Sequence, residues 1–148
     1  MQMTNRIKSF ILVALQFIFI FLLLSGTTFN NLSVVTYVFI VLSILLVFWA
    51  IITMQKSKLR IFPEPSANAT LITGGPYRFI RHPMYTAILL GITGLLIHQF
   101  SLVRLALVII LTTILVIKLT WEEKMLSQKF IGYSEYIKQT AKLFPFIF

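Results

Sequence analysis

A long charge-free segment constrains the fold of this chain most strongly, because no Lys, Arg, Asp, Glu or His occurs from Ser9 to Gln55. A helix needs about 20 mainly apolar residues to cross the hydrocarbon core of a bilayer. Backbone polar groups are satisfied there only in helices or closed barrels. Two such stretches fit, Ile7–Leu24 and Leu32–Met54, separated by a polar turn. The segment therefore predicts two membrane-spanning helices.

Two further apolar stretches follow the polar middle of the chain, over residues 84–98 and 100–121. The first is short, so we expect it either to begin at the membrane interface or to lean on its neighbours through Gly91 and Gly94. With 58% hydrophobic residues and 11% charged residues, the chain predicts an all-α polytopic membrane protein with about four transmembrane helices. We expect one domain over residues 1–148, with a loop over 55–83 and a C-terminal interfacial amphipathic segment over 122–148.

A secretory signal peptide is the alternative interpretation of the first apolar stretch, since Arg6 and Lys8 precede it. The stretch is longer than the apolar region of a typical signal peptide, and no small-x-small cleavage site follows it. We therefore expect it to remain as a span.

The basic residues indicate topology. The net charge is +9 and the sequence pI is near 10.2, but the Lys and Arg residues other than Arg104 and Lys118 lie before the first span, between the second and third, and after the fourth. Because cytoplasmic loops carry an excess of Lys and Arg, we expect both termini and the 55–83 loop on the cytoplasmic side of a bacterial or archaeal inner membrane. This placement favours contact with anionic membrane lipids and argues against nucleic acid as a partner.

The chain contains no cysteine, which excludes disulfides, thiolate catalysis and cysteine-ligated metals. Its two histidines, His82 and His98, are too far apart in sequence to form a metal-binding pair by themselves. We therefore expect no metal site.

A polar, turn-rich segment, Gly74–Tyr85, lies between the apolar stretches. Pro83 is typical of the first turn of a helix, so the third span should continue from Met84 onward. The start of a helix presents unpaired N–H groups and a positive dipole end, which favour a carboxylate or phosphate. The segment therefore indicates an anion site at the membrane surface.

A second polar cluster closes the fourth span and contains Lys118, Trp121, Glu122 and Glu123. Lys118 and Glu122 are four residues apart and share one helical face. We expect one of the two glutamates to be functional and the other to be solvated. Beyond them an apolar i, i+4, i+7, i+11 pattern predicts the interfacial helix, ending before Pro145.

These two clusters carry a family resemblance. Gly-Pro-Tyr-Arg-Phe-Ile-Arg-His-Pro-Met-Tyr at 75–85, preceded by Pro-Glu-Pro at 63–65 and Leu-Ile at 71–72, resembles the signature of the isoprenylcysteine carboxyl methyltransferase family and its phospholipid methyltransferase relatives. The Glu-Glu-x-x-Leu-x-x-x-Phe-x-x-Tyr-x-x-Tyr pattern at 122–136 and Leu-Phe-Pro-Phe at 143–146 resemble that family's closing motif. The resemblance covers about residues 56–148.

The resemblance implies that S-adenosylmethionine binds between the central loop, the start of the third span and the end of the fourth. Lys118 would occupy the position of a substrate-contacting arginine, with the charge kept but the bidentate fork lost. We name His82 and Lys118 as catalytic candidates. The implied cofactor-binding residues are Ala69, Thr70, Leu71, Ile72, Tyr77, His82, Pro83, Met84, Tyr85 and Glu122.

The sequence alone leaves the roles of several residues open. His82 is the nearby candidate for the general base that a hydroxyl or amine acceptor would need, and its plainer interpretation is a helix N-cap or a structural hydrogen bond. Tyr77 and Tyr85 are also typical of an interfacial aromatic belt. The acceptor is expected to be a lipophilic small molecule or a lipidated substrate, methylated on a carboxyl group or on another oxygen or nitrogen.

Two other functions fit parts of the chain. A membrane reductase using NADPH is one, since sterol reductases share a similar Arg-His-Pro-x-Tyr ending. A small four-span transporter or assembly subunit is the other, but transporters usually place an ionisable residue inside a span, which this sequence does not do at mid-membrane positions.

Overall fold

The computed structural model describes residues 2–55 and 70–145, and within them the fold is helical. The elements are α1 (Gln2–Ser25), α2 (Val34–Gln55), the 3-10 helix η1 (Gly75–Arg78), α3 (Pro83–His98), α4 (Leu102–Lys129) and α5 (Tyr133–Gln139). The described residues contain no β-strand, only a single parallel bridge between Ile80 and Ala141. The predicted all-α class is confirmed.

Three helices are long and apolar enough to cross a membrane. They contain the candidate spans Ile7–Ser25, Val34–Gln55 and Leu102–Lys129, with mean hydropathies of 2.6, 2.8 and 2.5. The fourth apolar helix, α3, has 16 residues, so at 1.5 Å per residue it is about 24 Å long, less than a bilayer core. Three of the four expected spans are therefore long enough to cross a membrane, and the expected third span is the short helix, as the sequence predicted.

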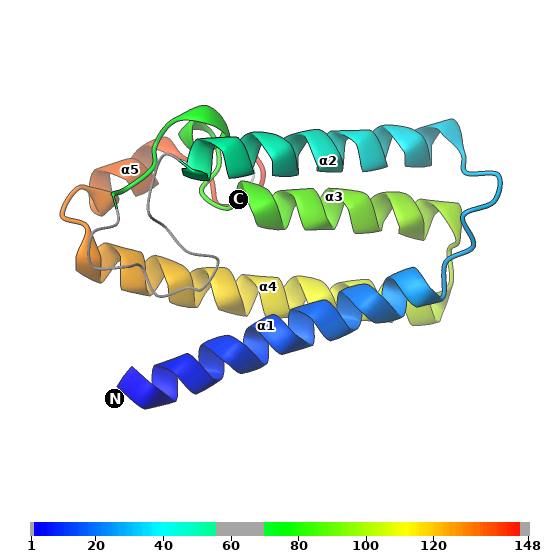
Figure 1. Ribbon diagram of the computed structural model, residues 1–148, viewed down its shortest axis with the longest axis horizontal. Coiled ribbons are helices and arrows are strands. Elements are labelled where there is room, and N and C mark those ends of the chain that lie inside the picture. Colours follow the sequence, from blue (N-terminus) through cyan, green and yellow to red (C-terminus); the bar gives the residue numbers. More distant parts are fainter. Residues whose placement is uncertain (1, 56–69, 146–148) are drawn as a thin grey trace.

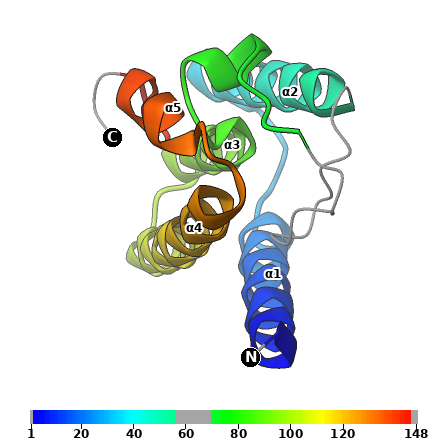
Figure 2. The same cartoon turned by 90° about the vertical axis from the view of Figure 1, so that its left-hand side faces the viewer.

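The helices pack in a chain of neighbours, α2 against α3, α3 against α4, and α4 against α1 (Figure 1). Seen from the end that carries α5, α1 lies beside α4 and away from α2 (Figure 2). The start of α3, the last turns of α4 and α5 all lie at this same end. The fold thereby brings together the two polar clusters that the sequence indicated, one before α3 and one at the end of α4.

Small residues bring α2 and α3 close together. A Cβ atom on Gly94 would lie 2.6 Å from Cβ of Phe39, and one on Gly91 would lie 3.0 Å from Oγ of Ser43. At the same contact Thr36 donates a hydrogen bond of 3.2 Å to the carbonyl oxygen of Gly94. Close backbone approach through glycine is typical of helix pairs in membranes, and it confirms that α3 leans on a neighbour through Gly91 and Gly94.

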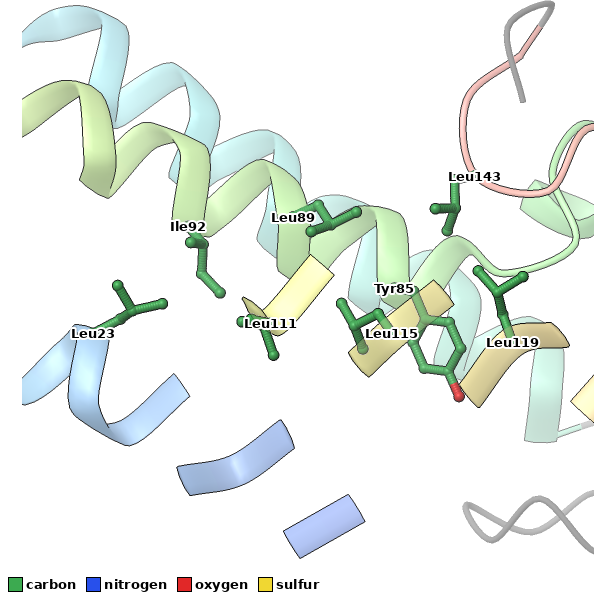
Figure 3. Packing of buried hydrophobic residues seen from close by; sticks show 8 residues of the cluster. All are labelled: Leu23, Tyr85, Leu89, Ile92, Leu111, Leu115, Leu119 and Leu143. Atoms are coloured by element: carbon green, nitrogen blue, oxygen red, sulfur yellow. The ribbon is translucent and has the colours of Figure 1, made fainter. Parts of the chain in front are cut away.

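The main apolar core lies between α1, α3 and α4 and receives one residue from the C-terminal end of the described chain (Figure 3). Many large apolar side chains on α1 and α2 stay exposed, among them Phe21 and Phe48, which suits contact with lipid tails. The core residues are Leu23, Tyr85, Leu89, Ile92, Leu111, Leu115, Leu119 and Leu143.

The opposite end of the molecule is tied by polar contacts between its two turns. The ring of His98 lies 2.9 Å from the carbonyl oxygen of Thr28, and the side-chain amide of Gln99 donates to the Thr28 hydroxyl at 2.6 Å. Arg104 donates to the Thr27 hydroxyl at 3.1 Å. His98, to which the sequence assigned no role, therefore lies far from the candidate site.

The C-terminal region differs from the expected interfacial helix over 122–148. Helix α4 continues through Lys129, Phe130 is extended, and α5 is a separate helix of seven residues. Gly132 lies in the break, where its backbone freedom disfavours helix continuation. The apolar pattern still directs Tyr133 inward, with 1% of its surface exposed, while Ile137 at 38% is not covered.

Candidate functional site

The loop before α3 is shaped by a glycine against α2. Gly75 has φ of +58°, in the left-handed region that favours glycine. A Cβ atom there would lie 2.3 Å from Oγ1 of Thr53. Pro76 is the second residue of η1, and Pro83 lies in the first turn of α3, as predicted. His82 occupies the N-cap position, but its side chain makes no capping hydrogen bond, so its ring is not used to cap the helix.

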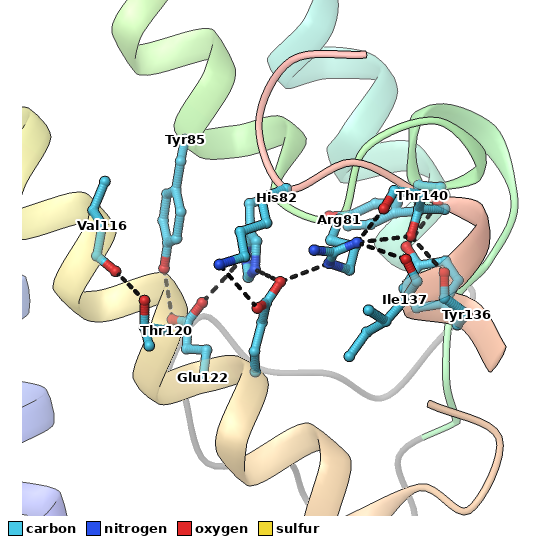
Figure 4. A network of polar contacts seen from close by, with 12 residues as sticks. Arg81, His82, Tyr85, Val116, Thr120, Glu122, Tyr136, Ile137 and Thr140 are labelled. Atoms are coloured by element: carbon cyan, nitrogen blue, oxygen red, sulfur yellow. Dashed lines mark hydrogen bonds and ion pairs between the residues drawn. The ribbon is translucent and has the colours of Figure 1, made fainter. Parts of the chain in front are cut away.

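Glu122 is the centre of a contact between α3 and α4 (Figure 4). Tyr85 donates a hydrogen bond of 2.6 Å to Glu122 Oε1, and His82 Nδ1 lies 3.6 Å from Glu122 Oε2. The His82 and Tyr85 rings are stacked, with centroids 5.4 Å apart and planes 3° from parallel. The structure thus brings together three residues that the sequence had singled out.

The second glutamate, Glu123, is also engaged. Arg81 Nε donates to its Oε1 at 2.6 Å, His82 Nε2 lies 3.5 Å from the same oxygen, and Lys142 Nζ lies 4.0 Å from Oε2. The Glu122 and Glu123 side chains are only 14% and 13% exposed. The expectation that one of them is solvated is wrong, because both turn toward the start of α3.

The ring nitrogen Nε2 of His82 is buried and makes no hydrogen bond to any described residue. Buried polar atoms normally find a partner. His82 is 8% exposed as a residue, so bulk water does not supply one freely. Glu123 Oε1 faces this nitrogen at 3.5 Å, which makes it an ion-pair neighbour and not a close hydrogen-bond partner.

The end of the described chain, residues 140–143, crosses the start of α3 and forms what we call the C-terminal strap. Its carbonyl groups accept hydrogen bonds from the backbone N–H of Arg81 at 2.8 Å and of His82 at 3.1 Å. Its Leu143 carbonyl accepts from the Thr86 hydroxyl at 2.6 Å. The Arg81 guanidinium also donates to the carbonyl and the hydroxyl of Thr140. These bonds fix the strap beside Glu123, whose Oε2 lies 4.0 Å from Lys142 Nζ.

Lys118 lies one turn before Glu122 on α4 and is buried, with 5% of its surface exposed. Its ammonium group donates to the side-chain oxygen of Gln16 at 2.8 Å. It also lies 5.0 Å from the centroid of the Tyr85 ring, a distance at which a cation is attracted to the ring face. Helix α1 therefore contributes a polar group next to the candidate site.

Tyr77 connects the loop to α2 and α5. Its hydroxyl lies 3.6 Å from Sδ of Met54, and its carbonyl accepts a hydrogen bond of 2.7 Å from the Tyr136 hydroxyl. Burial, and after it the charge of Glu122, raises the pKa of Tyr77 to about 12. The phenol is therefore neutral at physiological pH and suited to donate a hydrogen bond.

The remaining candidate cofactor residues are distributed differently. Pro83 and Met84 form the first turn of α3, next to His82. Thr70, Leu71 and Ile72 instead line a cavity of about 440 Å³ against α2, together with Trp49, Ile52, Thr53, Gly74 and Gly75. Neither His82 nor Glu122 lines this cavity. Ala69 lies outside the described residues.

The sequence did not predict a role for Arg81 or for Gln16. It indicated Glu122 and Glu123 as a pair but did not distinguish between their roles. Gln16 had one available signal, since it is a lone amide in the middle of a charge-free apolar stretch. Among residues 2–55 and 70–145, no group of three or more His, Cys, Asp or Glu side chains is arranged to hold a metal ion.

The sequence matches the family model described as phospholipid methyltransferase over residues 31–132. It is also similar to the cobalt-zinc-cadmium resistance protein CzcN of Cupriavidus metallidurans, with 37% identity over 79 residues. That alignment covers 53% of this chain and 37% of the length of CzcN. The family match includes α2, α3 and all of α4, and thus most residues of the site, but not α1.

Proposed function

The chain belongs to the phospholipid methyltransferase family, a group of membrane methyltransferases, and we propose that it transfers a methyl group from S-adenosylmethionine to a lipophilic acceptor. The observation that carries this proposal is the contact of Tyr85 and His82 with Glu122, between the start of α3 and the end of α4. Family membership favours methyl transfer over the reductase and transporter functions.

The residues present suit this cofactor, which supplies a methyl group on a cationic sulfonium together with an ammonium, a carboxylate and a flat adenine. Glu122 and Glu123 supply negative charge to a cationic group. The buried Nε2 of His82 makes no hydrogen bond among the described residues and lies 3.5 Å from Glu123 Oε1. Aromatic faces such as that of Tyr85 attract cations. The start of α3, where no side chain caps the helix, favours an anionic group.

Each protein group has a defined task in this proposal. Tyr85 fixes one oxygen of Glu122, so that the carboxylate is oriented before a ligand binds. His82 accepts a proton from a hydroxyl or amine acceptor, while a carboxylate acceptor would need no base. Enclosure between α3, α4 and the C-terminal strap excludes water and holds the reactants in line, which supplies much of the rate enhancement in a group transfer.

We propose that Thr70, Leu71 and Ile72 contact the cofactor from the side of α2. Tyr77 is proposed to contact it between these residues and Glu122. The cavity that these residues line is open to the face of α2 on which Trp49 and Ile52 are 48% and 44% exposed. Because this face suits contact with lipid tails, we propose that the acceptor enters sideways from the bilayer.

We propose that the site faces the cytoplasm. The C-terminal strap carries Lys142, and Lys124 and Lys129 follow the glutamates on α4. All three lie at the same end of the molecule as the start of α3. An excess of Lys and Arg at one membrane face is typical of the cytoplasmic side.

The proposal is tested by incubating membranes that contain the protein with S-adenosylmethionine carrying a deuterated methyl group. Mass spectrometry of the extracted lipids then identifies any species that gains the labelled methyl. We expect such a species with the unaltered protein and a strongly reduced amount with Glu122→Gln. Equal labelling with both proteins, or protection of the protein by NADPH but not by S-adenosylhomocysteine, would overturn the proposal.

A further inference from the structure

The pair formed by Gln16 and Lys118 links α1 to the candidate site through two buried polar side chains. Gln16 is 6% exposed and Lys118 is 5% exposed, and their contact of 2.8 Å joins residues far apart in the sequence. Gln16 also lies outside the region that matches the family. The pair is therefore a feature of this chain that the family match does not explain.

Lys118 has a second potential partner on its own helix. Glu122 follows it by four residues, a spacing at which opposite charges on a helix attract each other. In a poorly solvated environment this attraction is stronger than at a protein surface. Yet among the described residues no carboxylate oxygen lies within 4.0 Å of the Lys118 ammonium. Glu122 instead receives Tyr85 and lies beside His82.

Gln16 accounts for this arrangement. Its amide oxygen accepts a hydrogen bond from the Lys118 ammonium, and the Tyr85 ring provides a second attraction at 5.0 Å. A neutral amide holds the cation without adding a negative charge that would compete with Glu122 for a ligand. The two contacts together hold the ammonium away from the carboxylate one turn later.

We propose that Gln16 is a positioning residue that prevents Lys118 from pairing with Glu122. Glu122 is thereby left to Tyr85, to His82 and to a cationic group of the ligand. The effect on ligand affinity rests on the proposed function, whereas the effect on the Lys118–Glu122 contact does not.

The contact is tested without any ligand by dicyclohexylcarbodiimide, an apolar reagent that joins a carboxylate to a neighbouring amine as an amide with loss of one water. We expect Gln16→Leu to raise the yield of the Lys118–Glu122 cross-link about tenfold, the size expected for loss of a hydrogen bond to a charged group. Mass spectrometry of the digested protein measures the yield. The matched control is Phe17→Leu, at an exposed neighbouring position. Equal yields in all three proteins would overturn the proposal.

A second variant guards against misfolding of Gln16→Leu. Gln16→Glu keeps an oxygen acceptor at the same position, so we expect Lys118 to cross-link to the introduced α1 carboxylate and not to Glu122. A cross-link to Glu122 in this variant would contradict the proposal, because it would show that α1 does not hold the ammonium.

The effect on ligand binding is measured with S-adenosylhomocysteine by calorimetry on the whole protein in lipid nanodiscs. We expect Gln16→Leu to weaken binding about tenfold, and Gln16→Leu with Lys118→Met to bind as tightly as Lys118→Met alone, because no cation is left to pair with Glu122. Losses that multiply in the double variant would indicate a merely structural role and overturn the positioning role. If the unaltered protein does not bind S-adenosylhomocysteine, the proposed function fails, while the cross-linking result still decides the role of Gln16.

Discussion

Tyr85 donates its phenolic hydrogen to Glu122 across 2.6 Å, and this bond joins the first turn of α3 to α4. The same carboxylate lies 3.6 Å from His82, whose ring stacks on that of Tyr85. A largely buried carboxylate with a fixed neutral donor on one oxygen keeps its orientation, and its other oxygen lies beside His82. The bond is therefore the first target for substitution.

Tyr85→Phe removes the phenolic donor and keeps the ring. We expect S-adenosylhomocysteine to bind about tenfold more weakly, because Glu122 loses its fixed orientation, and the free energy of unfolding to fall by about 1–3 kcal/mol, the usual effect of an unsatisfied buried acceptor. Calorimetry and thermal unfolding measure the two effects. Tyr37→Phe, at a position 54% exposed on α2, is the control and should change neither.

Arg81→Met removes the guanidinium that joins Glu123 to the C-terminal strap. Because a largely buried carboxylate would lose its hydrogen-bonded partner, we expect a loss of about 3–5 kcal/mol in the free energy of unfolding. Faster trypsin cleavage after Lys138 and Lys142 should accompany it. The control, Arg78→Met, alters an exposed residue of η1, and equal effects of both substitutions would contradict this assignment.

Gly75→Ala tests the close approach of the loop to α2. The backbone there is left-handed, which costs other residues about 1–2 kcal/mol, and the added methyl group would meet Thr53 at 2.3 Å. We expect a lower melting temperature and weaker ligand binding. Gly74→Ala is the matched control, since its Cβ would meet no atom within 4 Å. Equal melting temperatures for the two variants would argue against the observed loop conformation.

The raised pKa of Tyr77 predicts that the protein loses stability in alkali. This pKa is raised by burial from 10.0 to about 12, so the fold favours the neutral phenol. The unfolded chain releases this proton first, and the stabilisation, complete below pH 10, is lost as the pH rises toward 12. Unfolding measured across this range should show a smaller loss of stability for Tyr77→Phe than for the unaltered protein. Identical slopes would show that Tyr77 is not shielded from water.

Much of the architecture could be predicted from local patterns. The charge-free segment determined the first two helices, because uninterrupted apolar sequence has few structural options in a bilayer. Pro83 placed the start of α3 within one residue, since proline suits the first turn of a helix. The break after Lys129 was missed because an apolar periodicity can continue in phase across Gly132 while the backbone does not.

The site was predictable where its residues lie in one motif and less so where distant segments meet. His82, Tyr85 and Glu122 were named from the sequence and do lie together. The partners of Arg81 come from the C-terminal strap, which no local pattern places beside α3. The contact of Gln16 with Lys118 depends on how α1 crosses α4, which helical periodicity does not determine. Both are consequences of tertiary packing.

The most direct measurement of the central claim is a calorimetric titration of the protein in lipid nanodiscs with S-adenosylhomocysteine. We expect the unaltered protein and Glu135→Gln to bind equally, because the Glu135 side chain is 67% exposed and forms an ion pair with the exposed Lys138. Glu122→Gln should bind at least about tenfold more weakly, because it removes the buried negative charge. Absence of binding to the unaltered protein, or equal affinity of Glu122→Gln, would contradict a cofactor site at Glu122.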